Sequence, residues 1–145
     1  MRVHLAVAAV ALALGGCEDI RQFQGAWEGS VSADPALRQG FAAGATMRAT
    51  IAEASRTALG MTVQLPDRAD AVPFEPVRHA ADDALGEMRL DGDPLRTFVG
   101  YVRPAGADPL LAIVSLFAAD HVDVRLVRGP DDVYGVFTLR HARAP

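Results

Sequence analysis

The 145-residue sequence contains no lysine and no asparagine, and it has a single cysteine. One cysteine excludes an intramolecular disulfide framework and a cysteine-rich zinc site. Without asparagine there is no Asn-X-Ser/Thr acceptor for glycans. All 14 basic residues are arginines, yet the formal net charge is −4, whereas a nucleic-acid-binding domain needs net positive charge on one face. The composition therefore predicts no nucleic-acid partner.

Long hydrophobic runs are also scarce, and the one unbroken run of ten apolar residues lies near the N-terminus, at residues 5–14. It is too short to cross a hydrocarbon core of ~30 Å, which takes about 20 apolar residues. Arg2 precedes the run, and Gly15 and Gly16 follow it. A basic start, a short apolar run and small residues at its end are typical of a secretory signal peptide. We therefore predict that residues 1–16 are a cleaved signal.

The residues Leu14, Gly15, Gly16 and Cys17 resemble the lipobox of bacterial lipoproteins, which reads leucine, a small residue, glycine or alanine, and cysteine. The resemblance implies that Cys17 carries a diacylglycerol on its sulfur, becomes the mature N-terminus and is acylated there with a fatty acid such as palmitate. Two or more acyl chains anchor a protein stably, whereas a lone exported thiol is a liability. The alternative is an ordinary cleaved signal followed by a free cysteine.

The resemblance also implies a location and a domain organisation. We expect a membrane-anchored lipoprotein of the bacterial cell envelope, with the outer membrane favoured over the inner because Glu18, rather than aspartate, follows the cysteine. Residues 17–22 are then a lipidated tether, at most ~20 Å long when extended, and residues 23–142 form one domain. Loss of Arg2 with the signal makes the mature chain more acidic, which argues against further attachment to anionic head groups.

Period-two alternation of apolar and polar residues recurs along this domain and predicts short strands. The expected strands lie at residues 23–31, 45–51, 57–65, 72–74, 86–90, 97–103, 110–117, 121–126 and 133–140. Pro73 and Pro76 interrupt the fourth, which suits an edge or bulged strand, and residues 110–117 are apolar on both faces, which suits a doubly covered strand. Only residues 35–43 are suited to a helical turn. We therefore predict an all-β antiparallel meander of eight to nine strands, closed as an up-and-down barrel or, alternatively, folded as a β-sandwich.

Gly25 and Trp27, on the first expected strand, resemble the Gly-X-Trp motif of the lipocalins and the wider calycin group. In that family the tryptophan closes one end of the barrel and packs against an arginine of the last strand. Arg140 stands at the corresponding place, so the resemblance implies that Trp27 and Arg140 close the barrel through a cation–π contact. The resemblance covers two short segments at opposite ends of the domain.

A barrel of this size has room inside for side chains or for one small ligand. Several expected inward positions are glycine or alanine, which is compatible with a cavity for a small apolar ligand. The expected lining of that cavity is Met47, Met61, Phe98, Val122, Val124 and Phe137. The alternative is a filled core in which the glycines relieve crowding at bends.

Catalytic motifs are missing: there is no Gly-X-Ser-X-Gly elbow, no phosphate loop and no His-Glu-X-X-His helix. His121 and Asp123 share one face of an expected strand, but two ligands are too few for zinc. We therefore expect no enzyme, no cofactor and no metal site. The leading interpretation is a non-enzymatic, lipid-anchored module that binds an envelope protein partner or stabilises an envelope assembly. The alternative is a lipocalin-like carrier of a small apolar ligand, and an enzyme ranks third.

Overall fold

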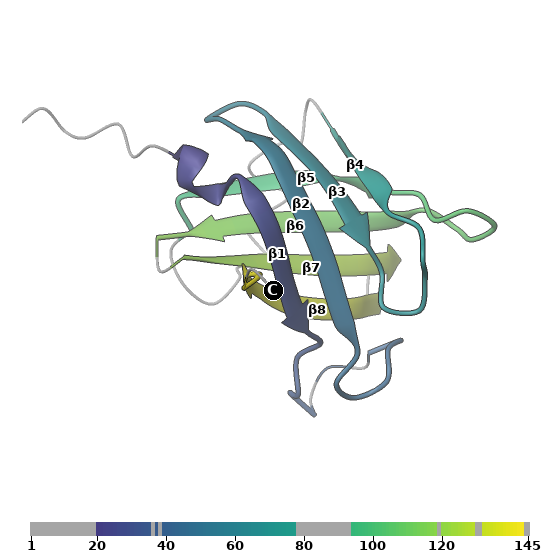
Figure 1. Ribbon diagram of the computed structural model, residues 1–145. Helices are drawn as coiled ribbons and strands as arrows, with labels where there is room; N and C mark the ends of the chain where they lie inside the picture. Colours follow the sequence, from purple (N-terminus) through teal and green to yellow (C-terminus); the bar gives the residue numbers. More distant parts are fainter. Residues whose placement is uncertain are drawn as a thin grey trace, which may run out of the picture.

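The computed structural model describes residues 20–35, 37, 39–77, 94–118, 120–129 and 132–143, without the side chains of residues 132 and 133. These residues form an all-β structure (Figure 1). The expected signal peptide, Cys17 and the expected strand at residues 86–90 lie outside the described residues. Within the described ranges, no helix combines the length and the apolar character that a membrane crossing requires.

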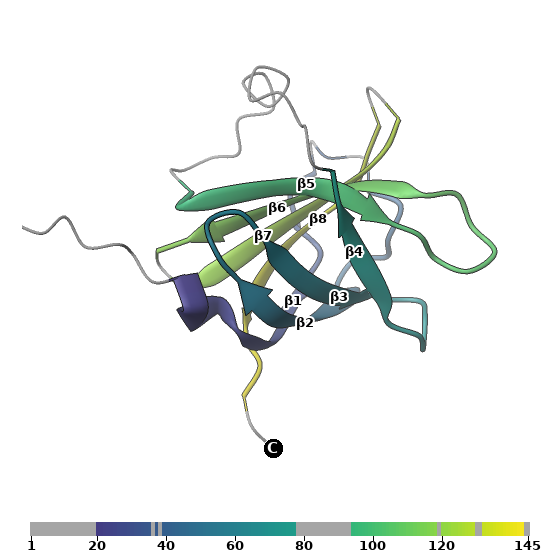
Figure 2. The same cartoon turned by 90° about the horizontal axis from the view of Figure 1, so that it is seen from above.

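A single 3-10 turn precedes eight strands that pair in sequence order. The elements are η1 (Ile20–Phe23), β1 (Gly25–Ser30), β2 (Thr46–Ala54), β3 (Leu59–Gln64), β4 (Val72–Pro76), β5 (Arg96–Val102), β6 (Leu110–Phe117), β7 (His121–Gly129) and β8 (Asp132–His141). Each strand is antiparallel to the next, and β1 closes on β8. This confirms the predicted meander and decides for the closed barrel over the sandwich. Figure 2 shows β5–β8 as one layer that crosses the layer of β1–β3.

The alternation read from the sequence is present in the strands. In β2, Met47, Ala49 and Ile51 are buried, whereas their neighbours Arg48 and Thr50 are exposed. Successive side chains of a strand point to opposite faces, so an apolar residue at every second position produces one buried face. Burial of that face against the opposite layer is the main force that holds the barrel together.

Strand β6 is buried on both faces, as its apolar sequence predicts. Leu111 is its one half-buried residue, and the other seven are buried. Ser115 lies on this strand with no exposed surface, and its hydroxyl is 3.0 Å from the hydroxyl of Thr97 on β5. This hydrogen bond satisfies a polar group that would otherwise be costly to bury.

Strand β4 lies inside the barrel wall and is not an edge, which corrects one of the two expectations for it. Val72 and Pro73 pair with β3, whereas Phe74, Glu75 and Pro76 pair with β5. The strand thus passes from one layer to the other, and each of its residues needs a partner on one side only. Proline lacks a backbone N–H, so it is tolerated in a strand that is hydrogen-bonded on one side at a time.

Aromatic rings fill the space beside two inward-facing glycines. A Cβ atom on Gly100 would overlap the carbonyl oxygen of Glu75 and would lie 2.7 Å from the ring of Phe74, and one on Gly135 would lie 2.8 Å from the ring of Phe41 and 2.9 Å from that of Phe137. These distances are shorter than carbon–carbon contact allows. These glycines therefore make room for rings.

The seam between β1 and β8 depends on a third glycine. Gly29 comes directly after Trp27 and Glu28, which pair with His141 and Arg140 of β8. A Cβ atom on Gly29 would overlap the carbonyl oxygen of Thr138. We expect Gly29→Ala to lower the free energy of unfolding by about 2–3 kcal/mol, because backbone atoms of β8 would have to move. Urea denaturation measures this change.

Gly129→Ala is the matched control for this prediction. Gly129 also lies in a strand, but a Cβ atom added to it would meet no described atom within 4 Å. We expect a change within about 0.5 kcal/mol for this variant. Equal effects of the two substitutions would show that the seam does not depend on the close approach at Gly29.

Candidate functional site

One end of the barrel is closed by residues that surround Trp27. Its side chain is 1% exposed, and its indole N–H donates to the carbonyl oxygen of Phe23 at 2.8 Å. The ring centroid lies 5.9 Å from that of Phe23 and 3.7 Å from that of His141. Ile20 of η1 is buried as well, so residues 20–22, expected to be tether, are part of the folded structure.

The partner of Trp27 on the last strand is His141, where the resemblance implies Arg140. The register places Trp27 opposite His141 and Glu28 opposite Arg140. Because neighbouring residues of a strand face opposite sides, Arg140 lies on the outer, exposed face. Trp27 contacts the ring of His141, and a contact between Trp27 and Arg140 stays a prediction.

The six residues expected to line an interior cavity come together in the main hydrophobic core. Five are buried and the sixth, Phe98, is partly buried against the same cluster. The buried members are Met47, Met61, Val122, Val124 and Phe137. The pocket described next is lined by a different set of residues.

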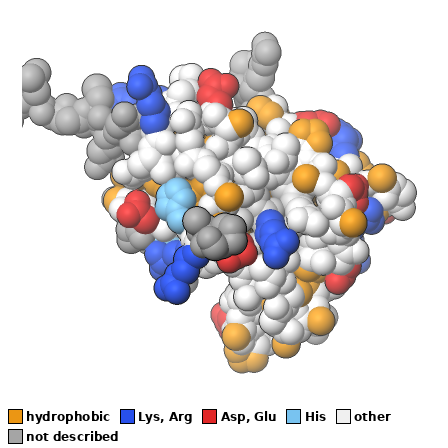
Figure 3. All heavy atoms as spheres, in the orientation of Figure 1, with side chains coloured by type: hydrophobic (Ala, Val, Ile, Leu, Met, Phe, Trp, Pro, Cys, Tyr) orange, Lys and Arg blue, Asp and Glu red, His pale blue; other side chains and the backbone are white. Residues whose placement is uncertain are grey.

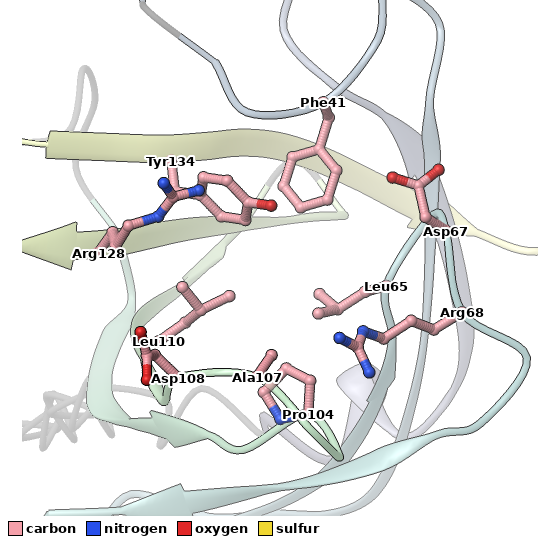
Figure 4. A pocket seen from close by; sticks show the side chains of 10 residues that line it. All are labelled: Phe41, Leu65, Asp67, Arg68, Pro104, Ala107, Asp108, Leu110, Arg128 and Tyr134. Atoms are coloured by element: carbon pink, nitrogen blue, oxygen red, sulfur yellow. The ribbon is translucent and has the colours of Figure 1, made fainter.

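A pocket of about 540 Å³ lies at the other end of the barrel, which we call the mouth (Figure 4). In a meander, the β1–β2, β3–β4, β5–β6 and β7–β8 connections meet at one end, and each of these hairpins contributes to the pocket. Its lining residues are Phe41, Leu65, Asp67, Arg68, Pro104, Ala107, Asp108, Leu110, Arg128 and Tyr134. This volume is within the range of pockets that hold small molecules.

Two guanidinium groups stand at the mouth in fixed orientations. Arg68 donates from Nη1 to the carbonyl oxygen of Ala105 at 2.8 Å, which joins the β3–β4 and β5–β6 turns. The guanidinium of Arg128 lies 4.1 Å from the centroid of the Tyr134 ring. A cation over an aromatic face is attracted by the quadrupole of the ring. Each guanidinium thus has one described contact that favours its position at the mouth.

Phe41 is brought to the pocket by the β1–β2 connection. Its ring centroid lies 4.7 Å from that of Tyr134 and 5.3 Å from that of Phe137. The connection is fastened to β8, because the N–H of Gly40 donates to the carbonyl oxygen of Tyr134 at 2.8 Å, and the N–H of Val136 donates to Oε1 of Gln39 at 3.1 Å. In its described residues this segment forms turns and bends, where a helical turn was expected.

The sequence offered no periodic signal for these pocket residues, because most belong to turns. A lone phenylalanine in a polar connection and an arginine in each of two turn regions are weak signals of a site. They become a pattern only when the four hairpins meet. The sequence therefore indicated a candidate site inside the barrel and gave no indication of the pocket at the mouth.

His121 and Asp123 share the outer face of β7, as expected, and Arg125 continues the same row. All three are half-buried, and the His121 ring stacks on Phe117 with centroids 4.4 Å apart. Nδ1 of His121, Oδ1 of Asp123 and Nε of Arg125 are buried and have no hydrogen-bond partner among the described residues. Among the described residues, no three of His, Cys, Asp or Glu are grouped to hold a metal ion.

The charged side chains of the barrel wall are dispersed and partly paired. Arg103 is 2.8 Å from Glu75, and Arg48 is 3.8 Å from Glu28. Figure 3 shows one face of the molecule, on which acidic and basic side chains are interspersed. Such exposed pairs contribute little to stability, and the mixed charge does not mark this face as a binding surface. No family model, no curated protein and no solved structure matches this sequence.

Proposed function

We propose that this protein is a lipid-anchored, non-enzymatic module of the bacterial cell envelope that binds a partner or ligand at the mouth of its barrel. The observation that carries the proposal is the placement of two features at opposite ends. Trp27 and η1 close the end where the folded chain begins, and the pocket lies at the far end. An anchor at one end leaves the other end free to bind.

The proposed anchor determines how the barrel stands on the membrane. Cys17 precedes Ile20 by three residues, a span of at most ~10 Å when extended. Lipid chains on Cys17 would therefore hold the closed end close to the bilayer, and the mouth would face away from it. We favour the outer membrane over the inner, because Glu18 follows the cysteine.

The lining of the pocket supports a binding role over a catalytic one. Its described lining residues include no histidine, serine or cysteine, which are the usual bases and nucleophiles of hydrolytic sites. Asp67 and Asp108 are exposed, so solvent screens their charges. The proposed occupant is either an envelope protein partner or a small molecule.

A carrier of a small ligand is the second candidate function, and the volume of the pocket favours it. Leu65 and Leu110 lie where the pocket meets the barrel core, and both are 5% exposed. Apolar side chains with a few placed polar groups are typical of small-molecule sites. In this version of the carrier proposal, the ligand sits at the mouth, above the packed core.

Intact-mass spectrometry of the protein extracted from its native membranes tests the anchor. We expect a chain that begins at residue 17 and is heavier than its sequence by a diacylglycerol and a further acyl group. A mature chain that begins elsewhere, or that carries a free thiol at Cys17, would contradict the proposal and support an ordinary secretory signal.

A further inference from the structure

We propose that the mouth pocket binds a small amphiphile with an anionic head group, a carboxylate or a phosphate. Arg68 and Arg128 receive the head group, and the apolar body lies over Leu65 and Leu110. This inference rests on the proposed function, because it takes the mouth as the binding site. It goes further by naming the chemistry of the ligand and the residues that select it.

Arg68 is the main determinant. Its side chain is half-buried, and Figure 4 shows its guanidinium directed into the pocket, toward Leu65 and Pro104. The hydrogen bond to Ala105 uses Nη1 and holds the group in that direction. A guanidinium has five N–H donors in a planar fork that matches a carboxylate or a phosphate. Most of these donors stay available for a ligand.

Arg128 supplies the second positive charge from the opposite side of the pocket. It is exposed, and its guanidinium carbon lies 4.1 Å from the centroid of the Tyr134 ring, a contact that favours this position of the side chain. Within the part of the chain that the structure describes, neither Arg68 nor Arg128 forms an ion pair, in contrast to Arg103, which is paired with Glu75. Two cations that have no carboxylate partner among the described residues favour an anion.

The acids of the pocket do not reverse this preference. Asp67 and Asp108 are exposed, and Figure 4 shows the Asp67 carboxylate turned away from Arg68. Arg128 is exposed as well, so the half-buried Arg68 carries the charge that solvent screens least. A cationic ligand would also need an aromatic face, and one face of Tyr134 is already covered by Arg128. The site therefore favours an anionic over a cationic head group.

The apolar part of the site selects for a ligand body. Leu65, Leu110 and Phe41 line the pocket from different sides (Figure 4). The two leucines are 5% exposed, so the half-buried Phe41 ring is the larger apolar surface. A free inorganic anion would contact the arginines but would leave this ring in water, whereas an alkyl or aryl body would cover it. The combination of fixed cations and an apolar base thus indicates an amphiphile.

Calorimetric titration of the full chain, made without lipid in a Cys17→Ala background, tests the inference. The probes are octanoate, octyl phosphate, octanol and octyltrimethylammonium, each below its micelle-forming concentration, and inorganic phosphate. We expect binding of octanoate or octyl phosphate, and the stronger of the two identifies the head group. We expect Arg68→Met to weaken this binding about tenfold or more, and Arg128→Met to weaken it as well.

Arg56→Met is the matched control. Arg56 is exposed in the β2–β3 turn at the closed end, so the same change of charge there should leave binding unchanged. Equal binding of octanol and octanoate, or no effect of Arg68→Met, would overturn the anionic head group but leave the mouth as a binding site. No binding of any probe to the folded protein would overturn the ligand class, whereas the lipid anchor would still stand or fall on the mass of the mature protein.

Discussion

Replacement of Cys17 by alanine is expected to abolish incorporation of radioactive palmitate and to leave the precursor unprocessed by the lipoprotein signal peptidase. Both effects have one cause, because the thiol is the atom that would receive the diacylglycerol, and the peptidase cleaves only after that transfer. The sequence offers no second cysteine. Metabolic labelling followed by gel electrophoresis measures both the lipid and the size of the protein.

Glu18→Gln is the control for this experiment. It changes the residue that follows the cysteine but leaves the sulfur in place, so we expect labelling and cleavage to be retained. Unchanged labelling of Cys17→Ala would refute the anchor. Cleavage of the alanine variant at the normal rate, without lipid, would instead identify the first 16 residues as an ordinary secretory signal.

Trp27→Ala is expected to lower the free energy of unfolding by about 3–5 kcal/mol. The substitution empties a fully enclosed site between Phe23 and His141 and leaves the carbonyl oxygen of Phe23 without its hydrogen bond. A domain of this size is stable by only about 5–15 kcal/mol, so the loss is a large fraction of the total. Urea unfolding of the full chain in the Cys17→Ala background measures it.

Two further variants separate the contributions at this end of the barrel. Trp27→Phe keeps a ring but removes the indole N–H, and we expect a loss of about 1–3 kcal/mol, smaller than for alanine. His141→Ala removes the outer ring, and because His141 is exposed we expect a smaller loss than for Trp27→Ala. A change below about 1 kcal/mol for Trp27→Ala would show that this residue does not close the barrel.

Much of the fold was predictable because it follows from local periodicity. Alternation at residues such as Met47, Ala49 and Ile51 requires strands with one buried face, and short turns between strands restrict the connections to neighbours. A two-sided apolar segment at 110–117 predicts a strand covered on both faces. These are properties of adjacent residues, and the structure confirms them.

The details that local periodicity did not provide depend on register and on pairing across the barrel. A shift of one residue moves a side chain to the other face, and the register of β1 and β8 places His141 opposite Trp27. The two prolines of β4 indicate that this strand lacks some backbone hydrogen bonds. They do not indicate that β3 pairs with the first part of the strand and β5 with the rest.

The sequence by itself thus determined the meander of strands, and it predicts the signal and the lipid site at Cys17, whereas the choice between a closed barrel and a sandwich came from the structure. Only the tertiary structure decided which residues line the pocket at the mouth. Phe41, Arg68, Arg128 and Tyr134 lie far apart along the chain and have no shared period. They meet because four hairpin ends converge at the mouth, and that convergence is set by the closed barrel as a whole.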